Sequence, residues 1–395
     1  MLAYGVKTPL RALSDDRRSR LDWEHNPPDS SLRKARRILV LTPFYKPFVG
    51  GAERFAEELT TRAPSSVTVD VYTARTRRML PKYEIIDGVA VYRLGFGCRY
   101  DKFLFPFLAT VKALFRRYDI THAVMASYAG AAALFIYWLK RTPYVLTLQS
   151  GTLDTPEYAR MIRFIAPLYC AIHLNARMVH AVSGSLRDRA LLLGVPPERI
   201  KVIPNGIDCA RYTDSHILRI PLRIVVLARL EKVKGVQYAI EAMKDIIARF
   251  PEAELIIAGN GSLRGTLESL VREKTLQEKI VFKGAIMPEE APAFLMTGTV
   301  FVCPSLAEGF GIVILEAMAA GCAVVATDTG GIPDIVNDGV DGLLVPVADA
   351  HALAAAVIRV LGDSALRAAL ARAGMVRARA FDWQELASRI HVLWK

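Results

Sequence analysis

The stretch that decides the fold runs from Val300 to Gly321 and reads VFVCPSLAEGFGIVILEAMAAG. Its first four residues form an apolar run, rich in β-branched and aromatic side chains, that predicts a buried strand. A loop with Glu308 and two glycines follows, and the apolar spacing from Ile312 onward predicts a helix. A strand, a loop and a helix in this order are the repeating unit of parallel α/β sheets.

The same unit recurs along the whole chain. Ile38–Leu41 predicts a strand, the loop after it ends in Gly50-Gly51, and Ala52–Leu59 has helical spacing. Further runs typical of buried strands are 67–72, 89–94, 121–125, 144–148, 178–182, 224–227, 254–258, 280–283, 323–326 and 342–345. The pattern restarts after Pro204-Asn205-Gly206-Ile207-Asp208. We therefore predict an α/β protein with two doubly wound, Rossmann-like domains that face a cleft.

The length of 395 residues agrees with two domains. We expect a polar basic arm at 1–34, an N-terminal domain at 35–210 and a C-terminal domain at 211–375. An aromatic-bearing helix at 376–395 is expected to cross back to the first domain, and a simple amphipathic terminal helix is the alternative.

Composition excludes several other classes of protein. With 52% hydrophobic residues the chain is not disordered. Its five scattered cysteines include no C-x-x-C pair, which argues against a disulfide framework or a structural zinc site. Residues 1–37 contain no apolar segment typical of a secretion signal. The longest apolar run, Ala129–Leu139, is about half the roughly 20 residues that a membrane span needs, so we expect a cytoplasmic chain, soluble or peripheral on the inner face of the membrane.

Candidate site residues follow the predicted strands. Glu308 and Glu316 lie eight residues apart, one in the loop and one in the helix, so they could hold two hydroxyl-bearing parts of one elongated ligand. Arg229 and Lys234 lie on the loop after strand 224–227, where two cations suit a diphosphate leaving group. Taken singly, each of these residues is also compatible with a surface charge or a helix-end charge.

Together, five segments resemble glycosyltransferase family 4 (group 1) in order and spacing. They are Val202–Asp208, Arg229 to Gly235, Ala258–Gly261, Glu308 to Glu316 and Gly330–Val336. The clear match covers about residues 195–350, and the Gly50-Gly51 loop extends it into the first domain. The resemblance implies the two-domain GT-B fold, retention of anomeric configuration and no obligatory metal. It also makes 35–210 the acceptor-side domain and 211–375 the nucleotide-sugar-binding domain.

The resemblance gives each matching residue a role. Arg229 and Lys234 would bind the donor diphosphate, Glu316 the ribose hydroxyls, and Glu308 the transferred sugar. Residues 310–312 would present backbone amides to that sugar, Gly284 to Ile286 would flank the base, and Gly50-Gly51 would close on the donor phosphates. The donor-binding residues are thus Gly50, Gly51, Arg229, Lys234, Gly284, Ile286, Glu308, Gly309, Phe310, Gly311, Ile312 and Glu316. Of these, Glu308, Arg229 and Lys234 are assigned to catalysis.

One position departs from the family pattern. Many members carry a histidine after the strand that corresponds to 144–148, whereas this chain has Gln149, which we place on the acceptor and sugar side. A glutamine cannot take up a proton, so a front-face mechanism, in which the departing phosphate accepts the proton of the acceptor, fits better. The histidines His122, His173 and His180 are expected to be core or surface residues.

The predicted function is a retaining transfer of sugar from a UDP- or GDP-linked donor to an acceptor, either lipid-linked or a growing polysaccharide. Two alternatives are a sugar-nucleotide epimerase or hydrolase of the same architecture and a catalytically silent nucleotide-sugar-binding subunit. We expect no metal, because the sequence contains no Asp-x-Asp, and no cofactor beyond the nucleotide sugar. The segment Gly259-Asn260-Gly261 reads as a tight turn or a neighbour of phosphate.

Charge is unevenly distributed. Residues 1–200 contain 30 Lys and Arg against 17 Asp and Glu, a difference of +13, whereas residues 201–395 contain 21 against 22, a difference of −1. Either this is a solvated basic surface or the first domain faces an anionic membrane; no nucleic-acid motif accompanies it. If the first domain faces a membrane, the basic residues expected to contact it are Arg75, Arg77, Arg78, Arg116 and Arg117.

Overall fold

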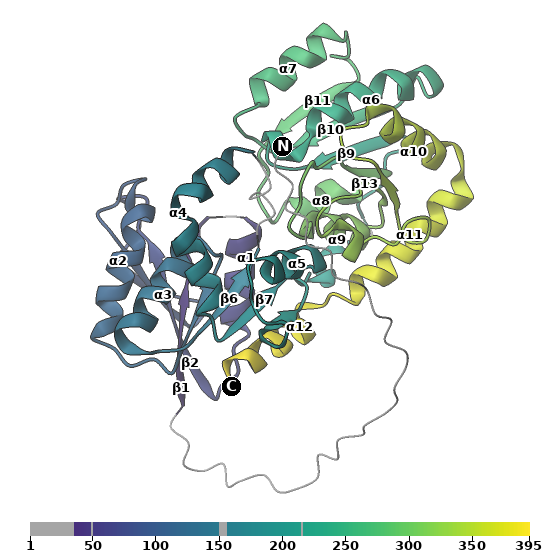
Figure 1. Cartoon of the computed structure of the whole chain (residues 1–395). Helices are drawn as coiled ribbons and strands as arrows, with labels where there is room; N and C mark the ends of the chain where they lie inside the picture. Colours follow the sequence, from purple (N-terminus) through teal and green to yellow (C-terminus); the bar gives the residue numbers. More distant parts are fainter. Residues whose placement is uncertain (1–34, 49, 150–155, 215) are drawn as a thin grey trace, which may run out of the picture. The chain divides into compact units, whose positions relative to one another are not determined.

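A computed structural model describes residues 35–48, 50–149, 156–214 and 216–395 (Figure 1). The predicted arm at 1–34 lies outside the described residues. Residues 36–395 form one unit that contains two β-sheets.

The first sheet has eight strands in the order β3-β4-β2-β1-β5-β6-β7-β8. Their bounds are β1 Arg36–Leu41, β2 Val67–Ala74, β3 Tyr83–Ile86, β4 Val89–Leu94, β5 Ile120–Val124, β6 Tyr144–Leu148, β7 Met178–Ala181 and β8 Ile200–Val202. All neighbouring pairs are parallel except β3 and β4. β5 and β6 are buried at every position, as expected for parallel strands covered on both faces.

The second sheet repeats this winding with six parallel strands in the order β11-β10-β9-β12-β13-β14. They are β9 Arg223–Leu227, β10 Glu254–Ala258, β11 Ile280–Gly284, β12 Val300–Cys303, β13 Ala323–Thr327 and β14 Leu343–Val345. The predicted α/β class with two Rossmann-like sheets is therefore confirmed. β3 and β8 are the two strands that sequence reasoning missed.

The helices connect the strands in each half of the chain. Those between strands of the first sheet are α1 Gly51–Thr61, α2 Asp101–Leu114, α3 Tyr128–Lys140, α4 Pro156–Leu174 and α5 Gly184–Leu192. Those that follow β9 are α6 Val236–Arg249, α7 Arg264–Glu273, α8 Ala291–Met296, α9 Ile312–Ala319, α10 Ala350–Gly362, α11 Ser364–Arg379 and α12 Trp383–His391. The apolar run 129–139 forms α3, which is buried along residues 129–134. Among the described residues, none of the helices is both long and apolar enough for a membrane span.

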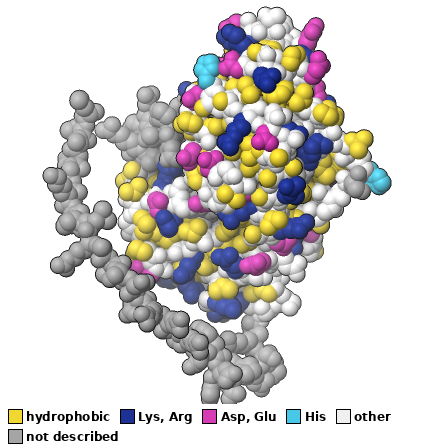
Figure 2. All heavy atoms as spheres, turned by 90° about the vertical axis from the view of Figure 1, so that its right-hand side faces the viewer, with side chains coloured by type: hydrophobic (Ala, Val, Ile, Leu, Met, Phe, Trp, Pro, Cys, Tyr) yellow, Lys and Arg dark blue, Asp and Glu magenta, His cyan; other side chains and the backbone are white. Residues whose placement is uncertain are grey.

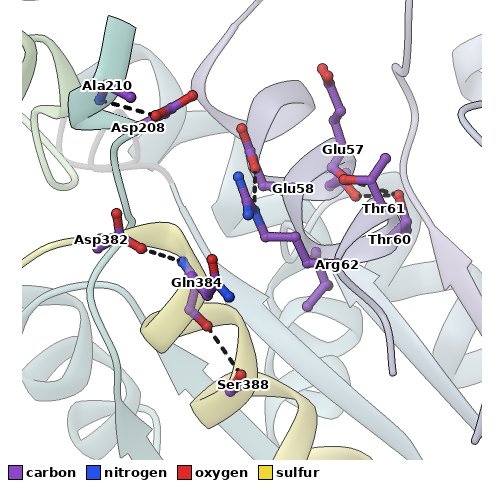
Figure 3. A network of polar contacts seen from close by, with 12 residues as sticks. Glu57, Glu58, Thr60, Thr61, Arg62, Asp208, Ala210, Asp382, Gln384 and Ser388 are labelled. Atoms are coloured by element: carbon purple, nitrogen blue, oxygen red, sulfur yellow. Dashed lines mark hydrogen bonds and ion pairs between the residues drawn. The ribbon is translucent and has the colours of Figure 1, made fainter. Parts of the chain in front are cut away.

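The chain returns to the first sheet after α11. The expected boundary at 376 falls inside α11, and the last helix, α12, begins at Trp383. Ile207 forms a parallel bridge with Asp382, and a Cβ on Gly206 would lie 2.6 Å from the Trp383 ring, so this close crossing requires glycine. α12 packs against α1, and Figure 3 shows the crossing, where the Asp382 carboxylate accepts the Gln384 N–H at 2.7 Å and starts the helix.

A buried series of hydrogen bonds links the C-terminal segment to the first sheet. It also determines which ring nitrogens of His122 and His180 carry a proton. Trp394 Nε1–H must donate to His122 Nδ1 (2.8 Å), so His122 Nε2–H donates to Thr147 Oγ1 (2.6 Å). The Thr147 hydroxyl then donates to His180 Nδ1 (3.0 Å), and His180 Nε2–H donates to the Ile203 carbonyl (2.7 Å). Burial lowers the pKa of His122 far below its usual value and that of His180 to about 4. Of the two positions expected for His122, His173 and His180, core or surface, all three occupy the core.

Candidate functional site

The predicted site residues lie at the switch point of the second sheet. β9 is flanked by β10 on one side and by β12 on the other, so the loops after β9 and β12 diverge at the carboxyl end of the sheet. Ligands of doubly wound sheets bind at this place. Arg229 and Lys234 follow β9, and Glu308 follows β12, so the fold brings the two predicted groups together.

Lys234 and Glu308 form an ion pair, with Lys234 Nζ 2.5 Å from Glu308 Oε2. Both side chains are less than one-fifth exposed. Gly235 makes the approach possible, because its φ is +60° and a Cβ there would lie 2.0 Å from the Pro304 carbonyl oxygen. The Leu306 N–H also donates to the Val233 carbonyl at 2.8 Å, which ties the two loops together. Arg229 lies on the same loop and is exposed.

Glu316 is paired with a residue from the first half of the chain. Its Oε1 accepts a hydrogen bond from Arg54 Nη1 at 2.5 Å, and the two side chains are 10% and 20% exposed. Burial opposes the charge of Arg54, but Glu316 together with Tyr212 and Glu58 outweighs it, and the pKa of Arg54 is raised. Tyr212, buried nearby, has its pKa raised by burial and by the same carboxylate. The Glu316 carboxylate, which the family resemblance assigns to the ribose hydroxyls, is therefore hydrogen-bonded by a residue of α1.

The first turn of α1 faces the first turn of α9. Gly50 is the residue before α1, and a Cβ on Gly51 would lie 3.6 Å from Ile312 Cδ1, where α9 begins. Helix N-termini carry unpaired backbone N–H groups and favour anions. Burial raises the pKa of Glu53 in this turn, against the opposing effects of its own backbone hydrogen bond and of the Arg229 charge. The arrangement places Arg229 within electrostatic range of α1.

The remaining predicted donor residues lie around these loops. Gly311, in the left-handed region with φ +97°, is the residue before α9, and the Phe310 ring is buried against Phe381 at 6.1 Å between centroids. Gly284 ends β11 and accepts a hydrogen bond from the Gly259 N–H at 2.7 Å. The Gly259–Gly261 segment packs on the Arg229-Leu230 loop, since Leu230 N–H donates to the Asn260 carbonyl at 3.0 Å. Further predicted positions in these loops are Gly309, which is buried, and Ile286, which is partly buried.

Gln149 is engaged with the Pro204-Asn205-Gly206 segment. Its amide donates to Asn205 Oδ1 at 3.1 Å, and the Asn205 amide donates back to Gln149 Oε1 at 2.9 Å. Asn205 is buried. This reciprocal pair fixes the orientation of the glutamine side chain at the end of β6.

Asp334 in the Gly330–Val336 segment bonds across to α5. Its Oδ2 accepts the Gly184 N–H at 2.5 Å, so an acid after β13 satisfies an N–H in the first turn of a helix that follows β7. Sequence analysis gave Asp334 only as part of the matching segment Gly330–Val336. It assigned no role to Arg54 or Glu53, although both follow the Gly50-Gly51 pair directly and that position was the available signal.

Comparison with known proteins agrees with this geometry. The profile of the family "Glycosyl transferases group 1" matches residues 219–377, and that of "Glycosyltransferase Family 4" matches residues 49–211. A GDP-mannose-dependent alpha-(1-6)-phosphatidylinositol monomannoside mannosyltransferase of Mycolicibacterium smegmatis is 33% identical, over 88% of this chain and 94% of that protein. An uncharacterized glycosyltransferase of Methanocaldococcus jannaschii is 31% identical, over 73% of this chain and 79% of that protein.

Solved structures share the fold. Sucrose-phosphate synthase from Thermosynechococcus elongatus superposes with a TM-score of 0.79 at 25% identity, over 91% of this chain and 98% of that one. Anabaena HepE in complex with UDP-glucose superposes with a TM-score of 0.75 at 22% identity, over 91% and 99%.

Two Rossmann-like sheets with these loops at their carboxyl ends define a glycosyltransferase of the GT-B fold. The chain belongs to glycosyltransferase family 4, group 1.

Proposed function

We propose that this glycosyltransferase moves a sugar from a UDP- or GDP-linked donor to an acceptor with retention of anomeric configuration and without a divalent ion. The observation that carries the proposal is the position of Arg229, Lys234 and the paired first turns of α1 and α9 at one edge of the second sheet. Cations and unpaired N–H groups at one place suit a diphosphate whose negative charge grows as the glycosidic bond breaks.

The ion pairs leave room for the donor. Lys234 uses one of its three N–H donors on Glu308, so two remain for diphosphate oxygens. Glu308 uses Oε2 for Lys234, which leaves Oε1 to accept a hydroxyl of the sugar. Arg54 holds one oxygen of Glu316 and leaves the other for ribose. The relatives lend support, because one is named as GDP-mannose-dependent and HepE binds UDP-glucose.

The proton of the acceptor has a route that needs no side-chain base. Gln149 cannot accept a proton and is locked to Asn205, which favours a front-face reaction. In it, the bond from sugar to phosphate breaks, the departing phosphate oxygen accepts the proton of the acceptor hydroxyl, and that hydroxyl bonds to the same face of the sugar.

A panel of nucleotide sugars with and without acceptor tests the proposal. We expect release of UDP or GDP that depends on acceptor, a product with the anomeric configuration of the donor, and equal rates in EDTA and in Mg²⁺. Sugar release without acceptor would instead indicate a hydrolase, interconversion of the sugar an epimerase, and nucleotide binding without turnover a silent subunit. Loss of activity in EDTA that Mn²⁺ or Mg²⁺ restores would contradict the metal-free part.

We further propose that the acceptor is a carbohydrate or a lipid-linked chain, and that the first domain works at an anionic membrane surface. The excess of +13 in residues 1–200 supports this view. On the face of the molecule in Figure 2, by contrast, basic, acidic and apolar side chains are interspersed.

A further inference from the structure

α2 carries an apolar face that nothing in the described residues covers. Its buried side, with Phe105, Ala109 and Ala113, packs inward, and α2 lies against α3. The opposite side and the residue after the helix expose large apolar groups at a helical spacing of three and four residues. Together with the end of α3, we call this the α2 face: Phe103, Leu104, Phe107, Val111, Leu114, Phe115, Trp138 and Leu139.

The exposure of the α2 face is large. Phe107 is 61% exposed and Phe115 is 85% exposed. A contiguous apolar surface of this kind in a soluble domain marks an interaction site. Phe107 and Trp138 both stack on Phe135, at 5.6 and 5.9 Å between ring centroids, so the face is continuous from α2 to α3.

The rim of the face is basic. Between residues 96 and 117 the chain has five Lys or Arg and a single acid, Asp101. Asp101 is buried and accepts the N–H groups of Gly97 (2.7 Å) and Cys98 (3.1 Å), so it presents no charge on the surface. Arg117 and Arg141 are exposed, and Lys102 lies over the Phe103 ring at 5.2 Å. Apolar side chains ringed by long cations suit the boundary between anionic headgroups and acyl chains.

Of the residues named from the sequence alone, Arg75 and Arg116 are less suitable than Arg117. Arg75 donates to the carbonyls of Leu80 (2.7 Å) and Arg78 (2.8 Å), and Arg116 donates to Tyr92 (2.8 Å) and pairs with Asp70 (3.4 Å). The guanidinium groups of Arg75 and Arg116 therefore have hydrogen-bond and ion-pair partners within the fold. Charge reversal there would test stability rather than docking.

We propose that the α2 face inserts into the interfacial region of an anionic membrane and that Arg117 and Arg141 contact its phosphates. This docking surface deepens the proposed function, in which the first domain works at an anionic membrane, and its use in delivering a lipid-linked acceptor rests on that function. We favour a membrane over a second copy of the chain because Lys and Arg outnumber acids five to one between residues 96 and 117, and Asp119, exposed beside Arg117, accepts the Arg37 backbone N–H at 2.7 Å.

The test is co-sedimentation of the full chain with vesicles of phosphatidylcholine alone or mixed with phosphatidylglycerol. Wild type should bind the mixed vesicles and be released by salt. Phe107→Glu with Phe115→Glu should weaken binding by roughly ten-fold or more, since both the apolar contact and the charge are lost. Arg117→Glu with Arg141→Glu should do the same. The matched controls are Leu192→Glu, at a site 88% exposed in α5, and Arg272→Glu on α7.

Three results would overturn the proposal: equal binding of wild type and the Phe107/Phe115 variant, no binding to either vesicle at low salt, or lipid-free dimers that this variant converts to monomers. Because the face lies outside the donor site, both variants should release UDP or GDP with a soluble acceptor at the wild-type rate. Loss of docking with intact turnover separates this proposal from the proposed reaction.

Discussion

Replacing Arg54 with leucine tests whether the two halves of the site are coupled through Glu316. The substitution leaves a shorter, apolar side chain in α1 and leaves the Glu316 carboxylate, 10% exposed, without its cation. An uncompensated charge at a buried position destabilises the folded state. We therefore expect the variant to fold with reduced stability and with a less ordered Glu316.

The magnitude follows from the geometry. Two unit charges about 4 Å apart attract by roughly 4 kcal/mol at an effective dielectric constant of about 20. Breaking a buried pair costs about 3–5 kcal/mol, and because Arg54 is 20% exposed we expect a smaller loss, about 2–3 kcal/mol. Removing both charges in Arg54→Leu/Glu316→Gln should cost less than the sum of the single changes, with a coupling energy of about 2 kcal/mol.

The assay is urea denaturation of the four proteins of this double-mutant cycle. Arg62→Leu, directly after the same helix, is the control, because Arg62 is 35% exposed and its pair with Glu58 at 2.7 Å is drawn in Figure 3. Such a pair contributes less than about 1 kcal/mol. A coupling energy near zero, which means that the double variant is destabilised by the sum of the two single changes, would refute the reasoning.

Nucleotide binding gives a second readout of the same variant. If Arg54 orients Glu316 toward ribose, Arg54→Leu should weaken binding of free UDP or GDP by about ten-fold, the equivalent of about 1.4 kcal/mol. Tighter binding in the variant would mean that Arg54 competes with the nucleotide instead.

Three further predictions address the site and the core. Lys234→Ala should lower kcat/KM by about 10²-fold or more, whereas Lys232→Ala, exposed on the same turn, should be neutral; near-normal kinetics of the first would remove Lys234 from the site. Glu316→Ala should weaken binding of free nucleotide, while Glu308→Ala should spare it and depress transfer; calorimetry with the opposite assignment would reverse the donor. Because the folded pKa of His180 is about 4 and its unfolded value is 6.5, the unfolded chain binds the proton that the fold excludes, so stability should fall as the pH drops through this window. Between pH 7 and pH 5 we expect a loss of roughly 2 kcal/mol from this residue, and equal unfolding free energies at the two pH values would contradict it.

The sequence by itself determined the architecture, because burial on both faces of a parallel strand demands a short unbroken apolar run. Glu254–Ala258 and Val300–Cys303 were predicted with the bounds that the structure has. It also placed Lys234 and Glu308 on loops that follow predicted strands, but only the strand order of the structure shows that these two strands are neighbours. β3 was not predicted because it lies at the edge of the first sheet. Tyr83–Ile86 alternates between exposed and partly buried there, so the apolar pattern is weak.

Tertiary structure alone decided the partners of the charged residues. Arg54 and Glu316 are 262 positions apart, and Gly184 and Asp334 are 150 apart, so no local spacing links them. Such pairs depend on where whole helices come to lie, which is set by packing of the core rather than by the propensity of either segment. The same holds for the α2 face. The sequence analysis made no prediction for residues 101–114, and only the packing of α2 on α3 determines which side is left exposed.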